Sequence, residues 1–248
     1  MLGDLDDAVR LSREGLSLVQ PGQVPAWALH LVAWRTYALA LRGDWDDALT
    51  MGERARQLWI EAGEIPAGYA NRGFFAALLV ALARRDEMAA ERLSATIDRI
   101  MAQFTASRFA PIYRDLLRLK SDAAPRLVTL ATAPDFRSTE LFERAMSLAA
   151  DREWPLPLDA LEAVRATHIA RGVRPLRASL DRAIALTRGD AALLRQVLAD
   201  AEEMHARPMI GRVRCELGRM TGDDAEMAAG LRVLRELGDE LQVERFEG

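Results

Sequence analysis

The sequence GDWDDA, at residues 43–48, joins the end of one amphipathic helix pattern to the start of the next. Asp44 is placed to cap a following helix, and the two acids after Trp45 put negative charge in its first turn, where the helix dipole favours it. A 4-3-4-3 spacing then keeps small or apolar residues on one face of a helix predicted over residues 44–62; these residues are Ala48, Gly52, Ala55, Trp59 and Ala62. Gly63 favours a left-handed stop after it.

The same phrase recurs along the chain. It reads GDLDDA at residues 3–8 and RDEMAA at 85–90, and its Gly-Asp opening returns at 189–190 and 222–223. The spacings are 40 and 42 residues in the first half and 33 in the second. Periods of this length are typical of stacked helical hairpins, in which each hairpin covers the apolar face of its neighbour.

Partner helices are predicted between these turns, over residues 26–42, 67–84 and 107–120, and a further helix over 191–205. The helix opened at 222–223 carries the same apolar spacing at Met227, Leu231, Leu234 and Leu237. Between the last two, Pro208 opens a helix with Gly211, Cys215 and Gly218 on one side, a small face suited to close helix contact. No alternating strand pattern competes with this interpretation. We therefore predict an all-α solenoid of stacked antiparallel hairpins with about 12 helices.

The repeats divide the chain into three parts. Regular repeats occupy residues 1–120 and 174–248, and prolines cut the stretch between them, 121–173, into short helices predicted over 125–133, 138–153 and 158–171. We interpret this stretch as an irregular junction within one continuous solenoid. A domain boundary is the alternative, but no Gly/Ser-rich linker marks one.

Composition indicates a soluble cytoplasmic protein. The formal net charge of the 248 residues is −4, with arginines interleaved among acids, which argues against nucleic-acid binding. The acidic start lacks a secretory signal pattern, and the longest apolar stretch, 73–83, is far too short to span a membrane. A single cysteine, Cys215, excludes an intramolecular disulfide and fits a reducing compartment.

No catalytic or metal-binding motif is recognised in the sequence. His30, His168 and His205 do not form a zinc-binding pair, Cys215 has no second cysteine at ligand spacing, and no phosphate-binding loop is present. The aspartate clusters coincide with predicted helix starts, where capping explains them better than magnesium binding. We predict a protein that is not an enzyme and has no metal or cofactor, with Cys215 buried rather than redox-active.

The Gly43-Asp44-Trp45 turn followed by Ala48 resembles the tetratricopeptide-repeat signature. It departs from that signature in its longer period and in helix ends such as EAGE at 61–64, where the standard repeat has a proline. Both departures resemble the divergent repeats at the carboxyl ends of large bacterial LuxR-type activators, which follow an NTPase module, and of nucleotide-cyclase fusions. Residues 206–218 and 221–239 are most similar to these. Because the chain begins at a repeat turn, we expect it to be a piece of a longer array; the alternative is that an unusual cap covers the exposed face of its first helix.

The resemblance implies a right-handed superhelix whose concave groove is lined by the first helix of each hairpin. His30, Tyr37, Arg72 and Phe75 would then face the groove, although they could equally fill the superhelix interior. We expect a non-catalytic scaffold that binds a protein or peptide, as the regulatory part of a bacterial signalling or transcription protein. The alternative is a sensory domain that binds a small-molecule inducer in a pocket lined by the amino-terminal tryptophans and Tyr37.

Overall fold

The computed structural model describes residues 4–19, 25–104, 110–131, 139–167 and 172–248, and every regular element in these ranges is a helix. There are fourteen α-helices and one 3-10 turn in this part of the chain. They are α1 (Leu5–Ser17), α2 (Pro25–Arg42), α3 (Trp45–Glu61), η1 (Gly68–Ala70), α4 (Asn71–Ala83), α5 (Glu87–Ala102), α6 (Ala110–Leu117), α7 (Ala123–Ala131), α8 (Thr139–Asp151), α9 (Leu158–Arg165), α11 (Arg174–Arg188), α12 (Ala191–Glu203), α13 (Arg207–Thr221), α14 (Asp224–Leu237) and α15 (Glu240–Glu247).

The helix predictions agree with this list to within a few residues at most ends. Two ends differ more: α4 starts four residues later than predicted, because residues 68–70 form the 3-10 turn η1, and α9 ends at Arg165, six residues before the predicted end at 171. Several predicted positions lie outside the described residues: the first repeat turn at Gly3, His168, and the helix ends at 107, 133, 138 and 171.

The repeat turns share one backbone device, a left-handed residue directly before the helix cap. Glycine supplies it at Gly43, Gly189, Gly222 and Gly238, and Arg85 supplies it in the repeat whose phrase has lost its glycine. The side chain of the next aspartate accepts a backbone N–H bond at Asp86, Asp190, Asp223 and Asp239, as Asp4 does at the start of α1. Asp44 is an exception to the predicted capping role, because its carboxylate pairs with Arg42 and makes no cap bond.

The helices pack mainly on their neighbours in sequence. Helix α2 contacts α1, α3 and α4, and α11, α12, α13 and α14 follow one another in the same way. One apolar core cluster includes residues from Leu29 to Ile184, so it extends on both sides of the junction predicted at 121–173. Helix α8, inside that stretch, packs on α11 and also touches α4.

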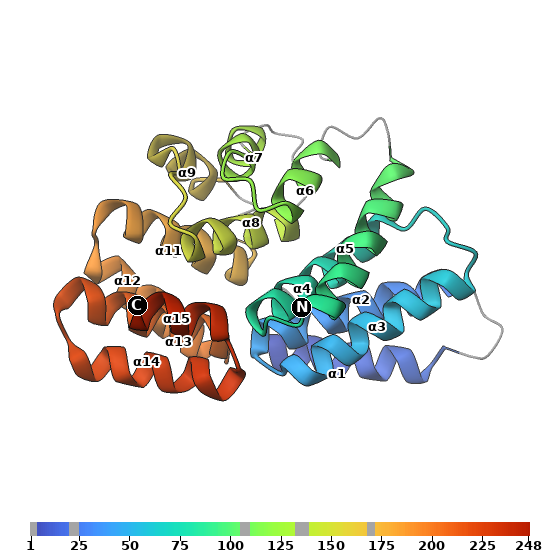
Figure 1. The fold of residues 1–248 in the computed structure, drawn as a ribbon, viewed down its shortest axis with the longest axis horizontal. Coiled ribbons are helices and arrows are strands. Elements are labelled where there is room, and N and C mark those ends of the chain that lie inside the picture. The colour runs from blue at the N-terminus through green and yellow to red at the C-terminus, as the bar shows by residue number, and fades with distance from the viewer. Residues whose placement is uncertain (1–3, 20–24, 105–109, 132–138, 168–171) are drawn as a thin grey trace.

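The two ends of the array meet. In Figure 1 the carboxyl-terminal helices, orange to red, lie beside the amino-terminal ones, blue to teal, with α6, α7 and α9 above them. Helix α13 contacts α2, and α15 contacts α4. Arg84 Nε donates to the carbonyl of Leu237 at 3.2 Å, and His205 on the α12–α13 turn lies 2.8 Å from Asp6. The amino-terminal and carboxyl-terminal helices that the structure describes therefore pack against each other.

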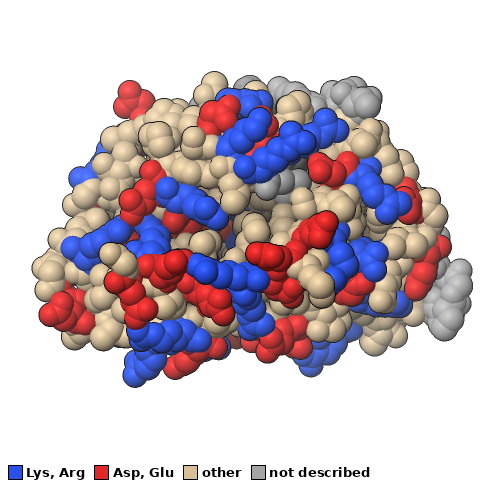
Figure 2. Space-filling model, viewed as in Figure 1, with Lys and Arg blue, Asp and Glu red and all other residues tan. Residues whose placement is uncertain are grey.

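The exposed surface carries both signs of charge. Figure 2 shows Lys and Arg side chains interspersed with Asp and Glu over the visible face, without a large area of one sign. Among the described helices, none combines the length and apolar character that a membrane crossing requires.

Candidate functional site

Aromatic side chains gather on one face of α2. Trp27, His30, Trp34 and Tyr37 follow at three- and four-residue spacing, which places them in a row along the helix. Tyr69 from η1 and Arg72 from α4 join this row, and together the six residues are called the aromatic cluster. Neighbouring rings meet mostly edge to face, the favoured aromatic geometry, with centroids 6.4 Å apart for Trp27–His30 and for His30–Trp34.

Polar contacts fix the orientation of the cluster. Trp34 Nε1 donates to His30 Nε2 at 3.1 Å, so that ring nitrogen accepts and the imidazole is neutral. Burial, and then the charge of Arg72, lower the pKa of His30, which keeps it uncharged at neutral pH. The Arg72 guanidinium stands 4.0 Å from the centre of the Trp34 ring, and its Nε donates to the carbonyl of Tyr69 at 3.0 Å.

The cluster runs from solvent into the interior. Trp27, at one end, is 68% exposed, whereas Tyr37, at the other, is 7% exposed. Helix α8 covers the Tyr37 end, where the phenol donates to Glu143 Oε2 at 3.2 Å and the Arg144 guanidinium lies 5.3 Å from the ring centre. A partner can therefore reach the Trp27 end and the half-buried rings beside it, but not Tyr37.

The four residues predicted to line a groove separate into two groups. His30 and Arg72 come together around Trp34, and Tyr37 belongs to the same row at its covered end. Phe75 does not join them: it is 2% exposed and lies in the core, on a helix whose residues 73–78 are all buried. Tyr69 was not among the predicted residues, and its ring centroid is 5.4 Å from that of His30.

Beyond Tyr37 lies a buried group of charged side chains that we call the central ionic cluster. It contains Glu143, Arg144 and Asp151 from α8, Arg182 from α11, Arg212 and Glu216 from α13, and Asp239 at the start of α15. Arg182 binds Glu216 through two nitrogens, at 2.9 and 2.6 Å, and Asp151 at 2.7 Å. Arg212 binds Asp239 at 2.8 Å and Asp151 at 3.3 Å.

Electrostatics differ between the two aspartates of this cluster. Burial opposes ionisation of Asp151, but Arg212 and Arg182 outweigh it and hold the pKa of Asp151 below its ordinary value. Burial raises the pKa of Asp239 despite its bond to Arg212, and the nearby charge of Asp151 adds to that rise. The cluster therefore consists of paired, largely buried charges, and losing one partner of such a pair is costly.

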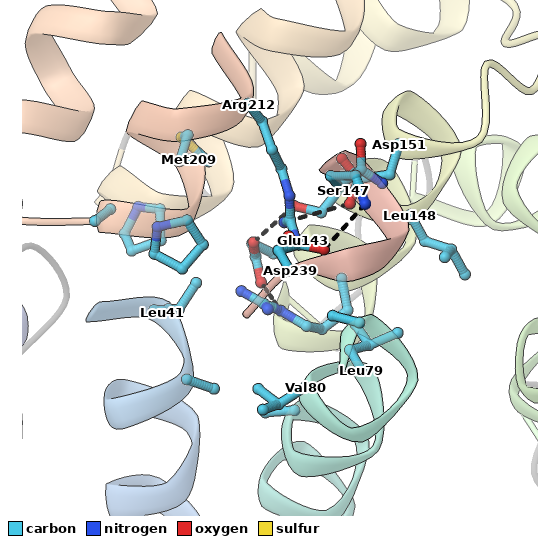
Figure 3. A pocket seen from close by; sticks show the side chains of 18 of the residues that line it. Leu41, Leu79, Val80, Glu143, Ser147, Leu148, Asp151, Met209, Arg212 and Asp239 are labelled. Atoms are coloured by element: carbon cyan, nitrogen blue, oxygen red, sulfur yellow. Dashed lines mark hydrogen bonds and ion pairs between the residues drawn. The ribbon is translucent and has the colours of Figure 1, made fainter. Parts of the chain in front are cut away.

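A cavity of about 60 Å³ opens beside the central ionic cluster, at the seam where the two ends of the array meet. Figure 3 shows Arg212 pointing from α13 toward Asp239 and Glu143, with Leu41 and Val80 on the facing helices α2 and α4. The space is enough for a few water molecules and too small for a metabolite the size of a nucleotide.

Metal ligation finds no support in the described ranges, where no group of three or more histidine, cysteine, aspartate or glutamate side chains is arranged to hold an ion. The aspartates at helix starts are used as caps or in ion pairs with arginine.

Comparison with known proteins gives no relative. No protein-family model matches the chain. No curated protein and no solved structure matches it either.

Proposed function

We propose that this chain is a non-catalytic helical-repeat module that binds a segment of a partner protein at the exposed end of its aromatic cluster. The observation that carries the proposal is the Trp27 side chain, which is 68% exposed and meets His30 edge to face at the end of a row of half-buried rings. Tryptophan, tyrosine and arginine are the residue types that dominate binding energy at protein interfaces.

The side chains of the aromatic cluster are preorganised for binding. His30 and Trp34 are held by their mutual hydrogen bond, and Arg72 is held over Trp34 by its bond to the Tyr69 carbonyl. Rings that are already fixed lose little conformational entropy on association. The chemistry suits an apolar or aromatic side chain packed on Trp27, with an acidic group near the Arg72 charge.

The similarity of the repeat turns to tetratricopeptide arrays, and of residues 206–239 to LuxR-type activators, supports the regulatory part of a bacterial signalling or transcription protein as the context. The partner would dock as an extended or helical peptide without covalent chemistry. An inducer pocket lined by tryptophans and Tyr37 is less well supported, because Glu143 and Arg144 cover the tyrosine.

Affinity capture with quantitative mass spectrometry tests the proposal. We expect a Trp27→Ala, Arg72→Ala double variant to lose about 30-fold or more in affinity for a partner recovered by the wild type, as truncation of an interface anchor costs about 2 kcal/mol or more. Met88→Ala is the matched control, since Met88 on α5 is 69% exposed and lies outside the cluster.

The partner identified in this way should then be titrated as a purified protein against all three forms, with circular dichroism verifying that each is folded. Equal affinity of the double variant and the wild type would reject the site. A metabolite that raises the melting temperature of the wild type but not of the double variant would favour the sensory alternative.

A further inference from the structure

A second, larger cavity lies in the carboxyl-terminal half of the array and shares no lining residue with the central cavity. Its walls come from α8, the connection between α8 and α9, α11, α13 and α15. We call it the carboxyl-terminal groove and define it by the apolar residues Trp154, Leu156, Leu186 and Met220. Its volume is about 590 Å³, which lies in the range of sites for small molecules.

The four apolar side chains that define the groove remain partly exposed. Trp154 and Leu156 pack against one core cluster of the molecule, whereas Leu186 and Met220 pack against the other. The groove therefore lies where the two clusters adjoin. Apolar surface that stays in contact with water favours an occupant that covers it.

Trp154 also offers a hydrogen-bond donor to such an occupant. Its Nε1 forms no hydrogen bond with the residues that the structure describes, and this atom is accessible to solvent. The indole nitrogens of Trp34, Trp45 and Trp59, in contrast, all donate to an acceptor within the chain. Because a half-buried tryptophan usually pairs its N–H, the groove favours an occupant with an oxygen acceptor.

The charged side chains that line the groove are already paired. Glu153 accepts from Arg219 at 2.8 Å and from Arg245 at 3.0 Å. The remaining charged residue, Glu216, is bound by two nitrogens of Arg182. A charged ligand would have to displace one of these pairs or stay unpaired beside apolar side chains, and both are unfavourable. The groove therefore suits an uncharged occupant.

We propose that the carboxyl-terminal groove binds an uncharged amphipathic small molecule, with an apolar body and one hydroxyl or carbonyl oxygen. The apolar body packs on Leu186 and Met220, and the oxygen accepts from Trp154 Nε1. Binding is then driven by the apolar surface that is covered and oriented by a single hydrogen bond.

Calorimetric titration and tryptophan emission with 1-octanol, sodium octanoate and octylammonium chloride test this site, because the three probes have matched apolar bodies and differ in charge. We expect 1-octanol to bind the wild type saturably, and both charged probes to bind about tenfold more weakly, since neither charge finds a free partner. Trp154→Phe should bind 1-octanol only a few-fold more weakly but lose the change in emission.

A leucine variant tests the apolar wall. Leu186→Gln alters the wall at a partly exposed position, and Leu11→Gln is the matched control, because Leu11 on α1 is 37% exposed and does not line the groove. Circular dichroism verifies that both are folded. We expect 1-octanol to bind Leu186→Gln about tenfold more weakly than the wild type, and to bind Leu11→Gln equally well.

Three results would overturn the proposal. Absence of saturable binding by 1-octanol would mean that water alone fills the groove. Equal affinity for the three probes would mean that the paired charges do not select an uncharged ligand. Equal affinity of Leu186→Gln and the wild type would mean that 1-octanol binds elsewhere. The Trp27→Ala, Arg72→Ala double variant should bind 1-octanol like the wild type, so this proposal and the partner-binding proposal fail independently.

Discussion

Two separate features of the structure require glycine at position 43: its backbone conformation and the close contact of its neighbours. Its φ of +98° lies in the left-handed region, which the Gly-Asp phrase already indicates. A methyl group added to it would also come within 2.9 Å of a Leu237 side-chain carbon and 3.0 Å of the Arg207 Cβ. The sequence reveals the first requirement, because the phrase repeats, but not the second, because Leu237 is far along the chain.

Substitution of Gly43 separates these two requirements. Gly222 is the matched control, since its φ is +71° and nothing lies within 4 Å of an added methyl group. We expect Gly222→Ala to lower the free energy of unfolding by about 1 kcal/mol through backbone strain alone. Gly43→Ala should cost about 2–4 kcal/mol, because overpacking against α13 and α14 is added. Urea denaturation measures both, and equal losses would mean that the seam is looser than described.

At the scale of helices, local sequence signals were sufficient for most boundaries. Left-handed residues followed by aspartate mark α5, α12, α14 and α15, and the turn survives even where Arg85 replaces glycine. Two features differed from the prediction, because another interaction or another helix type replaced the expected one. Asp44 binds Arg42 instead of capping α3, and the 3-10 turn η1 takes the residues that were assigned to the start of α4.

Which residues of a helix face the surface was harder to predict than where the helix begins and ends. Phe75 was assigned to a groove by alignment of repeats, but α4 is surrounded by α2, α3, α5, α8 and α15. Its sequence, NRGFFAALLVALA, is apolar on all sides, which is typical of a fully buried helix and could have indicated this. His30 and Arg72 lie together around Trp34, beside the exposed end of the row of rings, and their assignment to a binding groove stays a prediction.

Helices α13 and α14 confirm the predicted small face. A methyl group added to Gly230 of α14 would come within 2.5 Å of Cys215 Sγ on α13, so the two backbones approach closely. Burial raises the pKa of the Cys215 thiol to about 12, and the adjacent Glu216 charge adds to the rise. The thiol is therefore protonated and enclosed at neutral pH.

Thiol labelling measures how tightly these two helices pack. We expect a disulfide reagent at pH 8 to modify native wild-type protein very slowly and urea-unfolded protein at once, because native Cys215 must wait for opening. Gly230→Ala should label faster, since the added methyl displaces α14. Rapid labelling of the folded wild type would show that the helices are not in close contact.

The whole molecule depends on contacts that no repeat pattern contains. Tyr37 and Glu143 are 106 residues apart in sequence, Arg84 and Leu237 are 153 apart, and Asp6 and His205 are 199 apart. The central ionic cluster also assembles from four helices whose charged residues look like ordinary helix-surface residues in the sequence. Hairpin periodicity predicts neighbours along the array, so it could not predict these pairings.

Acid should weaken the whole fold through these pairs. The folded-state pKa of Asp151 lies below its unfolded value, so its contribution is present above the unfolded pKa and is lost as pH falls through the folded one. Asp6, Asp115 and Glu153, whose pKa values are also lowered, act in the same direction. Asp239 acts oppositely, because its pKa is raised and its contribution declines as pH increases.

Urea unfolding of the wild type and of Asp151→Asn at pH 7 and pH 4 tests this expectation. The wild type should lose stability between the two pH values. Asp151→Asn should be less stable by about 3 kcal/mol at pH 7, since buried Arg182 and Arg212 each lose a charged partner, and it should lose less on acidification. Parallel pH dependence of the two proteins would assign the acid effect to other carboxylates.

The contact of Gly43 with Leu237 has a consequence for how the chain reaches its native state. An open array can nucleate at any repeat and grow unit by unit, with each added hairpin stable on the one before. Here the last helices contact the first ones across almost two hundred residues of sequence. Part of the stabilising free energy is therefore gained only after the two ends have come together. Folding is then slowed by the entropy of that long-range search, and loss of either end leaves the other without its lateral support.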